Sequence, residues 1–594
     1  MYLQINILAN FIINKYFNNN NCLLIITDRN NNFEYNGNLS YVYVKLNGIE
    51  IPYNLVFRSY GCQGIVITCQ SPVSIFENLE LGMKLGSDRF NYRKYLFLTV
   101  TNQLETSLDV LKSKAAEFVA DILIVAVDSD ESIFDLYTHK FAGPKEKSTD
   151  ITWLDRWYSI NNSFLFDSNL YPDKLENLEG RPFRIICFTY KPYCIIDPPD
   201  GTDMLVALEY ARKHNMTPEL VVDEAGEWGN LYDNWTGNGV VGNLAQDMGD
   251  IGLGALYTWE REYSFFDYSK PTMRSGITCI APAPRLASGL ATPFVSFSME
   301  LWIMTLSSYF LASVALLIVL SVTISDENDK KRNVNNIMLS LSLAGRIFLL
   351  QSFQKVPNLE QSRITFGLAL ILSLMLNTIY SSGLSSTMTI PRYYGTIHDA
   401  DDLAASEIKW GATSTAWIES IDSDSRKVFV HIVKNFQILT EKELAAFNDE
   451  DLAYAVEHLQ GGNLALGSYI SLDGIQRRRL LDEDLYWEYC VLMLRKNSIF
   501  LSSLNDVILA VTESGLLYYW EHQTVYKYMD MNMQKAVKMS LRANNPGGSN
   551  SIVKLNLDHV IGAFTIWGVG ILISIIVFIC ELIKNKYNRG DNKV

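Results

Sequence analysis

Three stretches of the chain are apolar and free of charged residues over a length that spans a bilayer. They cover 301–325, 364–391 and 560–580. A helix of about 20 apolar residues crosses the roughly 30 Å hydrocarbon layer of a membrane. The pattern therefore predicts three transmembrane helices, the second of which ends in a polar run rich in Ser, Thr and Gly.

A shorter apolar run, 335–353, lies between the first two stretches and is interrupted by Arg346. It is too short and too charged for a comfortable further crossing, so it favours a re-entrant pore loop. An amphipathic helix lying in the membrane interface is the alternative.

The orientation follows from the short charged segments beside these stretches. Basic residues outnumber acidic ones in the connection 326–363 and in the tail from 581 onward, although the whole chain carries a net charge of −15. Positive segments stay in the cytoplasm, so residues 1–300 and 392–558 are expected outside. Four N-glycosylation sequons precede the first span, at Asn38, Asn161, Asn215 and Asn234. The N-terminal stretch lacks the basic start of a signal peptide.

The two outer segments alternate short apolar runs with helical patterns. Runs such as 183–190, 220–223, 250–257 and 464–470 are typical of strands, whereas 204–214 and 502–515 have helical periodicity. Alternation of this kind favours an α/β fold. Because 181–299 and 392–558 flank the predicted pore module 300–391, we expect them to form one bilobed α/β domain. Residues 1–180 are a separate short α/β region, and 559–594 hold the last span and a tail.

Composition excludes several classes of function. Hydrophobic residues make up 48% and charged residues 19% of the chain, which is typical of a membrane protein. No long basic cluster offsets the negative charge, so we do not expect a nucleic-acid partner. Neither a metal-binding spacing nor a catalytic constellation is evident, so we expect no metal, no cofactor and no enzyme activity. Cys62 with Cys69, and Cys187 with Cys194, are each close enough in sequence to close a loop.

Several motifs resemble ionotropic glutamate receptors. Residues 237–282, with Asp267-Tyr-Ser-Lys-Pro271 followed by Gly276-Ile-Thr, resemble the end of the first ligand-binding segment. Pro357, Arg363 and the run 380–389 are similar to the pore exit and gating helix, 502–517 to the late second segment, and 557–564 to the entry to the last span. The shortness of the N-terminal region 1–180, together with the later motifs TYKPY (189–193) and DNWTGNG (233–239), makes the chain resemble most the variant ionotropic receptors of arthropods, a chemosensory and thermo- or hygrosensory family.

The resemblance implies a set of ligand-binding residues. Arg261 is the candidate clamp for a ligand carboxylate, although it falls one residue early relative to Asp267 and is otherwise a solvated arginine. Trp228 matches the aromatic residue that covers the ligand pocket in the family. The alternative is that Trp228 is an ordinary core residue. Thr413 and Ser414 lie in the turn that would bind the far end of the ligand, or in an ordinary helix start. Tyr469 stands where the family has the acid that holds an α-amino group.

Leu256 also stands where the family has a threonine that assists the clamp. Losing both groups removes charge-assisted and neutral hydrogen bonds to an amino acid, so glutamate is not the expected agonist. Small organic acids, amines, or no small ligand remain open.

The resemblance also places the pore and the gate. Counting back from Arg363 puts Leu350 at the selectivity position, with Gln351 beside it. Glutamine carboxamides arranged around the pore axis would suit weakly selective cation passage. Leucine side chains in the same arrangement would form a hydrophobic constriction that excludes water. Close approach of four helices at a gate is expected at small residues and their neighbours, namely Tyr380, Ser381, Ser382, Gly383 and Leu384.

These features together predict a subunit of a ligand-gated nonselective cation channel acting as a sensory receptor. Three spans and one loop cannot enclose a pore alone, so the chain must assemble. The resemblance implies a tetramer formed with a co-receptor subunit, in the plasma membrane of sensory dendrites or cilia. A non-conducting accessory or ligand-binding subunit is the alternative. A membrane enzyme is disfavoured because no catalytic constellation is present.

Overall fold

The computed structural model describes residues 2–28, 33–46, 61–99, 104–127, 132–283, 285–286, 289–323, 330–352, 360–389, 393–394, 397–446, 452–542 and 557–591. The chain divides into two compact units. The first contains Met1–Pro282 and His398–Leu541, and the second contains Ala283–Ile397 and Arg542–Val594. Each unit is described by itself.

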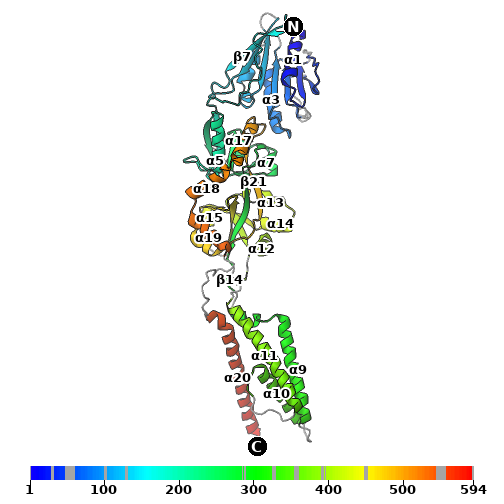
Figure 1. The fold of residues 1–594 in the computed structure, drawn as a ribbon, viewed down its shortest axis with the longest axis vertical. Coiled ribbons are helices and arrows are strands. Elements are labelled where there is room, and N and C mark those ends of the chain that lie inside the picture. Colours follow the sequence, from blue (N-terminus) through cyan, green and yellow to red (C-terminus); the bar gives the residue numbers. More distant parts are fainter. Residues whose placement is uncertain are drawn as a thin grey trace. The chain divides into compact units, whose positions relative to one another are not determined.

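The first unit begins with an eight-stranded sheet in the order β2-β1-β3-β4-β5-β6-β7-β8 (blue to cyan in Figure 1). The strands β2 to β5 are parallel and the last three pairs are antiparallel. Its elements are α1 (Tyr2–Tyr16), β1 (Leu23–Asp28), β2 (Tyr41–Leu46), β3 (Gly64–Thr68), α3 (Pro72–Leu85), β4 (Lys94–Leu98), α4 (Leu104–Leu108), η1 (Asp109–Lys112), η2 (Lys114–Phe118), β5 (Ile122–Val127), β6 (Ile133–His139), β7 (Ile151–Tyr158) and β8 (Ser163–Phe164).

Both faces of this sheet are covered, which explains why its inner parallel strands β1, β3, β4 and β5 are mainly apolar and buried. Alternate residues of β1 enter opposite cores: Leu24 and Ile26 pack with α3, whereas Leu23 and Ile25 pack with α1. The N-terminal stretch, which has the composition of a poor signal peptide, thus forms a helix that covers one face of the sheet.

The disulfide of this sheet differs from the predicted pairing. Cys62 is bonded to Cys22, with a Cα–Cα distance of 4.7 Å, and Cys69 is free and buried. The expected Cys62–Cys69 loop is wrong because strand register decides the pairing. Cys22 and Cys62 precede the neighbouring parallel strands β1 and β3, in which Leu23 faces Gly64, whereas Cys69 follows the far end of β3.

A second sheet of eleven strands forms the rest of the first unit. Its main path is β10-β9-β11-β21-β13-β18-β16-β17. Its elements are β9 (Pro182–Cys187), α5 (Thr202–Lys213), β10 (Thr217–Val222), α6 (Gly239–Ala245), β11 (Ile251–Tyr257), α7 (Glu260–Tyr263), β12 (Phe266–Tyr268), β13 (Met273–Pro282), α12 (Ala400–Ala405), β16 (Lys409–Ala412), η4 (Thr415–Trp417), α13 (Glu419–Asp422), α14 (Lys427–Lys434), β17 (Phe436–Ile438), α15 (Glu441–Ala446), β18 (Leu452–Leu459), β19 (Leu464–Ala465), α16 (Leu472–Gln476), β20 (Arg478–Leu480), β21 (Tyr486–Arg495), α17 (Leu501–Glu513), α18 (Leu516–Tyr528) and α19 (Met531–Arg542).

The mixed α/β pattern that the sequence predicts is confirmed in this sheet. The strands β9, β10 and β11 pair in parallel at one end, and β16, β17 and β18 pair in parallel at the other. Between the two sets, β13 and β21 run antiparallel to each other and to their outer neighbours. The middle strands therefore join residues that precede the apolar helices to residues that follow them.

A buried ion pair lies where the first sheet contacts the end of β21. Arg93, 2% exposed, donates from Nε and Nη2 to the two oxygens of Glu80 at 2.7 and 2.8 Å. The same guanidinium donates from Nη1 to the carbonyl oxygen of Asn497 at 2.8 Å, and the Tyr95 hydroxyl donates to Glu80 at 2.6 Å. This cluster holds the loop after β21 against the first sheet.

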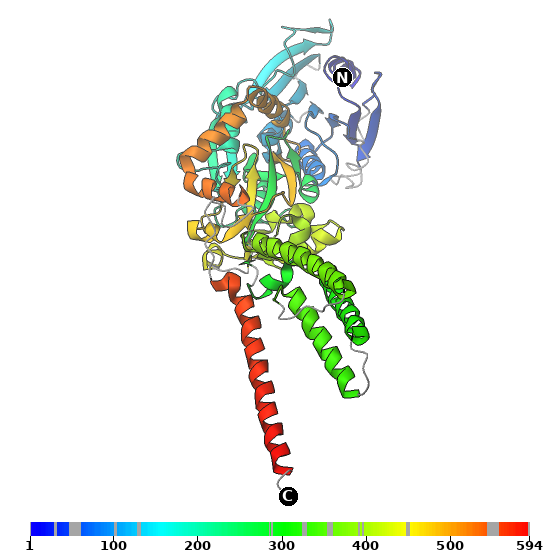
Figure 2. The same ribbon diagram turned by 60° about the horizontal axis from the view of Figure 1, so that its bottom comes forward.

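The second unit contains three helices that are long and apolar enough to cross a membrane, over Met299–Val319, Arg363–Met388 and Val560–Ile583. Its elements are β14 (Arg285–Leu286), η3 (Gly289–Ala291), α8 (Thr292–Val295), α9 (Met299–Thr323), α10 (Lys330–Phe348), α11 (Glu360–Thr389), β15 (Tyr393–Tyr394) and α20 (Leu557–Asp591). By length and composition, these helices fit the three predicted spans. The long helix α20 is drawn in red in Figure 2.

The shorter helix α10 packs between α9 and α11. Leu316, Ala344, Ile347 and Phe366 form a small apolar cluster among the three helices. The Tyr309 hydroxyl donates to the carbonyl oxygen of Leu341 at 3.2 Å. The predicted apolar run is thus a helix that is held on both sides by its neighbours.

We expect Arg93→Ala to destabilise the first unit strongly. Removing the guanidinium leaves the Glu80 carboxylate buried without its partner, which costs about 3–5 kcal/mol of unfolding free energy. Thermal unfolding of the purified full chain measures this loss. Arg212→Ala, which removes an exposed pair with Glu209, is the control and should leave the midpoint unchanged; equal effects of the two variants would contradict the assignment.

The stability of the first unit should also rise with pH above neutrality. Lys174 Nζ donates to the Ala120 carbonyl and the Thr138 hydroxyl, both at 2.7 Å, and burial lowers its pKa to about 7. Between that value and the ordinary lysine pKa near 10.4, the unfolded chain binds a proton that the folded chain does not, so the unfolding free energy rises with pH.

Lys174→Met removes this group and should flatten that part of the pH profile. The measurement compares unfolding midpoints at about pH 7 and 9.5 for the wild type, Lys174→Met and the exposed control Lys112→Met. A Lys174→Met profile parallel to that of the wild type would refute the assignment.

Candidate functional site

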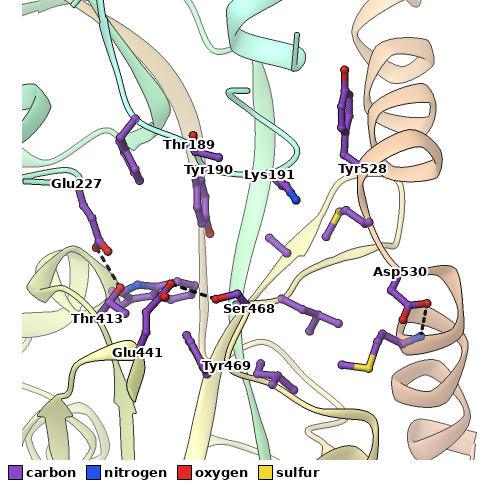
Figure 3. Close-up of a pocket in the computed structure, with 18 of the residues that line it drawn as sticks. Thr189, Tyr190, Lys191, Glu227, Thr413, Glu441, Ser468, Tyr469, Tyr528 and Asp530 are labelled. Atoms are coloured by element: carbon purple, nitrogen blue, oxygen red, sulfur yellow. Dashed lines mark hydrogen bonds between the residues drawn. The ribbon is translucent and has the colours of Figure 1, made fainter. Parts of the chain in front are cut away.

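A cleft of about 820 Å³ opens in the second sheet of the first unit (Figure 3). One part of its wall comes from the connection after β9 and from residues 224–228. The other part comes from the end of β16, the start of α15, the segment after β19 and the junction of α18 and α19. Residues from both flanks of the apolar helices therefore share this cleft.

Aromatic side chains form the first wall. The Trp228 ring lies 4.8 Å from the Tyr190 ring and 6.1 Å from the Trp417 ring, measured between centroids. Trp228 is 5% exposed, and its indole N–H donates to the carbonyl oxygen of Gly254 at 2.7 Å. The Trp228 side chain thus lines the cleft and is also anchored in the core. It therefore combines the pocket position and the core position that the sequence left open.

The second wall carries polar groups among apolar side chains. The Thr413 hydroxyl donates to Glu227 at 3.0 Å, across the cleft from one flank to the other. Ser414 does not line the cleft; its hydroxyl accepts from the amide of Ala416 and caps η4. Tyr469 lines the cleft, and burial raises the pKa of its phenol. The Ser468 hydroxyl beside it donates to Glu441 at 3.2 Å.

Arg261 lies outside this cleft. It sits in α7 between two glutamates, its side chain is 48% exposed, and its Nη2 lies 3.1 Å from the carboxylate of Asp233. It is not among the residues that line the cleft. The geometry therefore gives no contact through which Arg261 would clamp a ligand carboxylate there.

Glu457 is a buried acid that sequence reasoning did not single out. It lies in the apolar strand β18, is 1% exposed, and accepts from the hydroxyls of Tyr190, Tyr193 and Tyr257 at 2.5, 2.8 and 2.8 Å. The Ser275 hydroxyl also donates to it. Burial raises the pKa of this carboxyl, although the hydroxyl donors oppose that effect. A single Glu inside the apolar run 452–459 was the only local signal.

Glu457 connects the cleft wall to the middle of the sheet. Its partner Tyr190 also lines the cleft, and both Glu457 and Trp228 border a small hollow beside it. Displacing Tyr190 would therefore disturb a buried carboxylate that β11 and β13 also hold through Tyr257 and Ser275.

The predicted pore residues follow the last turn of α10. Leu350 has a φ of 52° and is exposed, and the Gln351 amide donates to the carbonyl oxygen of Arg346 at 2.8 Å. Ser373 and Asn377 of α11 donate to the carbonyl oxygens of Ile347 and Phe348 at 2.7 and 2.8 Å. The end of α10 is thus tied to α11, and the two candidate side chains stand free of this packing.

The predicted gate residues lie on α11. The Tyr380 hydroxyl donates to the carbonyl oxygen of Pro293 at 3.1 Å, and its ring lies 5.3 Å from that of Phe297. Gly383 lies beside Ser296, where an added Cβ would be 3.1 Å from the backbone oxygen. Ser381 and Ser382 are exposed, and Leu384 is half-buried. The short segment before α9 therefore packs along this part of α11.

The remaining predicted sites are on the surface or in the core. The sequon residues Asn38, Asn161, Asn215 and Asn234 are all exposed. Cys187 and Cys194 are buried and unbridged, with their thiols in hydrogen-bond contact. Among the residues that the structure describes, no group of three or more His, Cys, Asp or Glu side chains is arranged to hold a metal.

Comparisons with known proteins agree with this architecture. The family model described as a ligand-gated ion channel matches residues 298–571. The kainate-type ionotropic glutamate receptor glr-3 of Caenorhabditis elegans is 26% identical over 42% of this chain and 32% of its own length. Glutamate receptor 2 of the same organism is 23% identical over 63% of the chain and 40% of the receptor.

Glutamate receptor 3 of Mus musculus is 22% identical over 71% of this chain and 47% of the receptor. The chain thus spans about a third to a half of the length of these relatives. The chain is therefore similar to ionotropic glutamate receptors, and its three apolar helices fit a transmembrane protein.

Proposed function

We propose that this chain is a subunit of a ligand-gated, nonselective cation channel that serves as a sensory receptor of the variant ionotropic receptor kind. The observation that carries the proposal is the cleft shared by the two flanks of the apolar helices, with Thr413 hydrogen-bonded to Glu227 across it. The matched family model and the three apolar helices support the channel part.

In this proposal, the second sheet with its helices is a bilobed, periplasmic-binding-protein-like domain made of 181–299 and 392–558. The N-terminal region 1–180 is an accessory domain, and α10 with the residues after it forms a re-entrant pore loop. A ligand that binds more tightly to the closed cleft shifts the population toward that state. Because the chain leaves the domain at Pro282 and returns at His398, closure would pull directly on the strand that leads to α9 and on the segment that follows α11.

One subunit with three spans cannot surround a pore, so the channel would assemble as a heterotetramer with a co-receptor subunit in the plasma membrane of sensory dendrites or cilia. Glutamate is not the proposed agonist, because Tyr469 lines the cleft and Arg261 is absent from its walls. Currents from cells that co-express the chain with candidate co-receptors test the proposal, using acids, amines, humidity steps and temperature steps as stimuli. Absence of current under every stimulus would favour a non-conducting accessory subunit.

The topology gives a first prediction. If 1–300 lie outside the cell, the exposed sequons at Asn161, Asn215 and Asn234 should carry glycans. Treatment with a glycosidase should then increase the mobility of the chain on a gel, and Asn→Gln at these three positions and at Asn38 should abolish that shift. Labelling of a tag inserted after Ser40 from the cytoplasmic side would contradict the topology.

The pore gives a second prediction. If Gln351 lines the constriction, Gln351→Arg adds a positive charge in a narrow site, and a cation about 4 Å away is repelled by about 4 kcal/mol at an effective dielectric constant near 20. Permeability to divalent cations should fall first, because the repulsion doubles with ionic charge. Reversal potentials in solutions of different cations measure the change.

Leu350→Arg is the matched control, because counting back from Arg363 places Leu350, and not Gln351, at the selectivity position. If it alters ion selectivity and Gln351→Arg does not, Leu350 is the constriction and our preferred residue is wrong. If neither variant alters the currents of a working heteromer, this chain does not line the conduction path.

A further inference from the structure

The cleft carries an excess of negative charge. Four carboxylates line it, from Glu224, Glu227, Glu441 and Asp530, whereas Lys191 is the one basic residue among the lining residues. Figure 3 shows Glu227 and Glu441 extending from different elements toward the region of Thr413. A carboxylate ligand would have to enter against this charge.

Neutral groups are the partners of these carboxylates. Glu227 accepts from the Thr413 hydroxyl and Glu441 from the Ser468 hydroxyl, at 3.0 and 3.2 Å. Glu224 accepts from the hydroxyl and amide of Thr189, and Asp530 accepts from the amide of Asn532 at the start of α19. Within the described residues, none of the four forms an ion pair with a basic side chain of this chain.

Glu227 shows the effect of this arrangement. Its pKa is raised, first by burial and also by the negative charges of Glu441 and Glu224. A cation placed near Glu227 and Glu441 would relieve both the desolvation and the repulsion. The negative charge near Glu227 and Glu441 is therefore not balanced by an ion pair within the described residues.

The remaining wall suits the body of an organic cation. Tyr190, Trp228, Trp417 and Tyr469 present aromatic rings to the cleft, and such rings attract a desolvated ammonium through their faces.

We propose that the cleft binds an organic ammonium ion, whose charged group lies between Glu227 and Glu441 and whose apolar body lies against Trp228 and Trp417. The inference rests on the proposed function, in that it assigns the ligand class of the same cleft. The proposed ligand differs from the carboxylate that the sequence predicts Arg261 to hold. Arg261 instead forms an ion pair with Asp233 outside the cleft.

The test uses matched probes and the purified full chain. Propyl, hexyl and phenylethyl skeletons are each supplied as the ammonium, the neutral alcohol and the corresponding carboxylate, and binding is followed by tryptophan fluorescence. At least one ammonium should bind saturably and at least about tenfold more tightly than its alcohol and its carboxylate, because a charge-assisted hydrogen bond is lost in both. Binding should weaken as the pH falls and Glu227 becomes protonated.

Two variants locate the charge. Glu227→Gln combined with Glu441→Gln keeps the shape of the wall and should weaken ammonium binding at least about tenfold. Asp233→Asn removes an exposed acid outside the cleft and is the matched control, which should bind as the wild type does. Circular dichroism of each variant establishes that it is folded.

The inference is overturned if no ammonium binds, if a carboxylate binds as tightly as its ammonium, or if the double variant keeps the wild-type affinity. Failure of the channel proposal has a different signature. Saturable ammonium binding with no current in any heteromer would count against conduction and would still support the ligand class.

Discussion

Strand β13 joins the two flanks of the apolar helices through backbone hydrogen bonds, and β11 and β12 join them further through β21. Strand β13 is the last strand before the chain leaves the first unit at Pro282, and its partners β18, β20 and β21 all follow the return at His398. These ladders are antiparallel and continuous with parallel strands on both sides, so the cleft, Glu457 and the contact with Arg93 depend on them. A change that separated β13 from β18 would separate Ser275 from Glu457 at the same time.

Two buried carboxylates of the first unit each have several hydrogen-bond donors. Glu80 is held by Arg93 and Tyr95, and Glu457 by three tyrosines and a serine. Charges buried in this way cost solvation free energy, and the hydrogen bonds offset part of it while fixing the geometry. The carboxylates of the cleft differ, because they face an open volume and meet only neutral partners.

Much of the fold follows from local patterns. The runs around β9, β10 and β11 were predictable as strands, α5 and α17 as helices, and the three spans as apolar helices, because each carries one local pattern over its length. The run 464–470 was also expected to be a strand, but only Leu464–Ala465 pairs in the sheet, and the rest forms a cleft wall. Periodicity cannot distinguish apolar residues that face a cleft from those of a strand.

What the sequence could not reveal depends on contacts between distant residues. Strand register brings Cys22 next to Cys62, with which it forms a disulfide. Glu457 accepts hydrogen bonds from its tyrosines only when β18 is paired with β13. The placement of Arg261 beside Asp233, away from the cleft, likewise reflects the local path of α7 and not the composition around it. Trp228, Thr413 and Tyr469 were found because the resemblance, rather than their own neighbours, singled them out.

The position of β13 in the chain also determines the order of events during synthesis. Its first hydrogen-bonding partner, β18, begins at Leu452, after the ribosome has made α9, α10 and α11. At roughly 5–20 residues per second this interval is on the order of ten to thirty seconds. Throughout it, the apolar strand β13 has free edges of the kind that pair with other chains. Productive folding of this chain therefore depends on protecting one strand while its apolar helices are made.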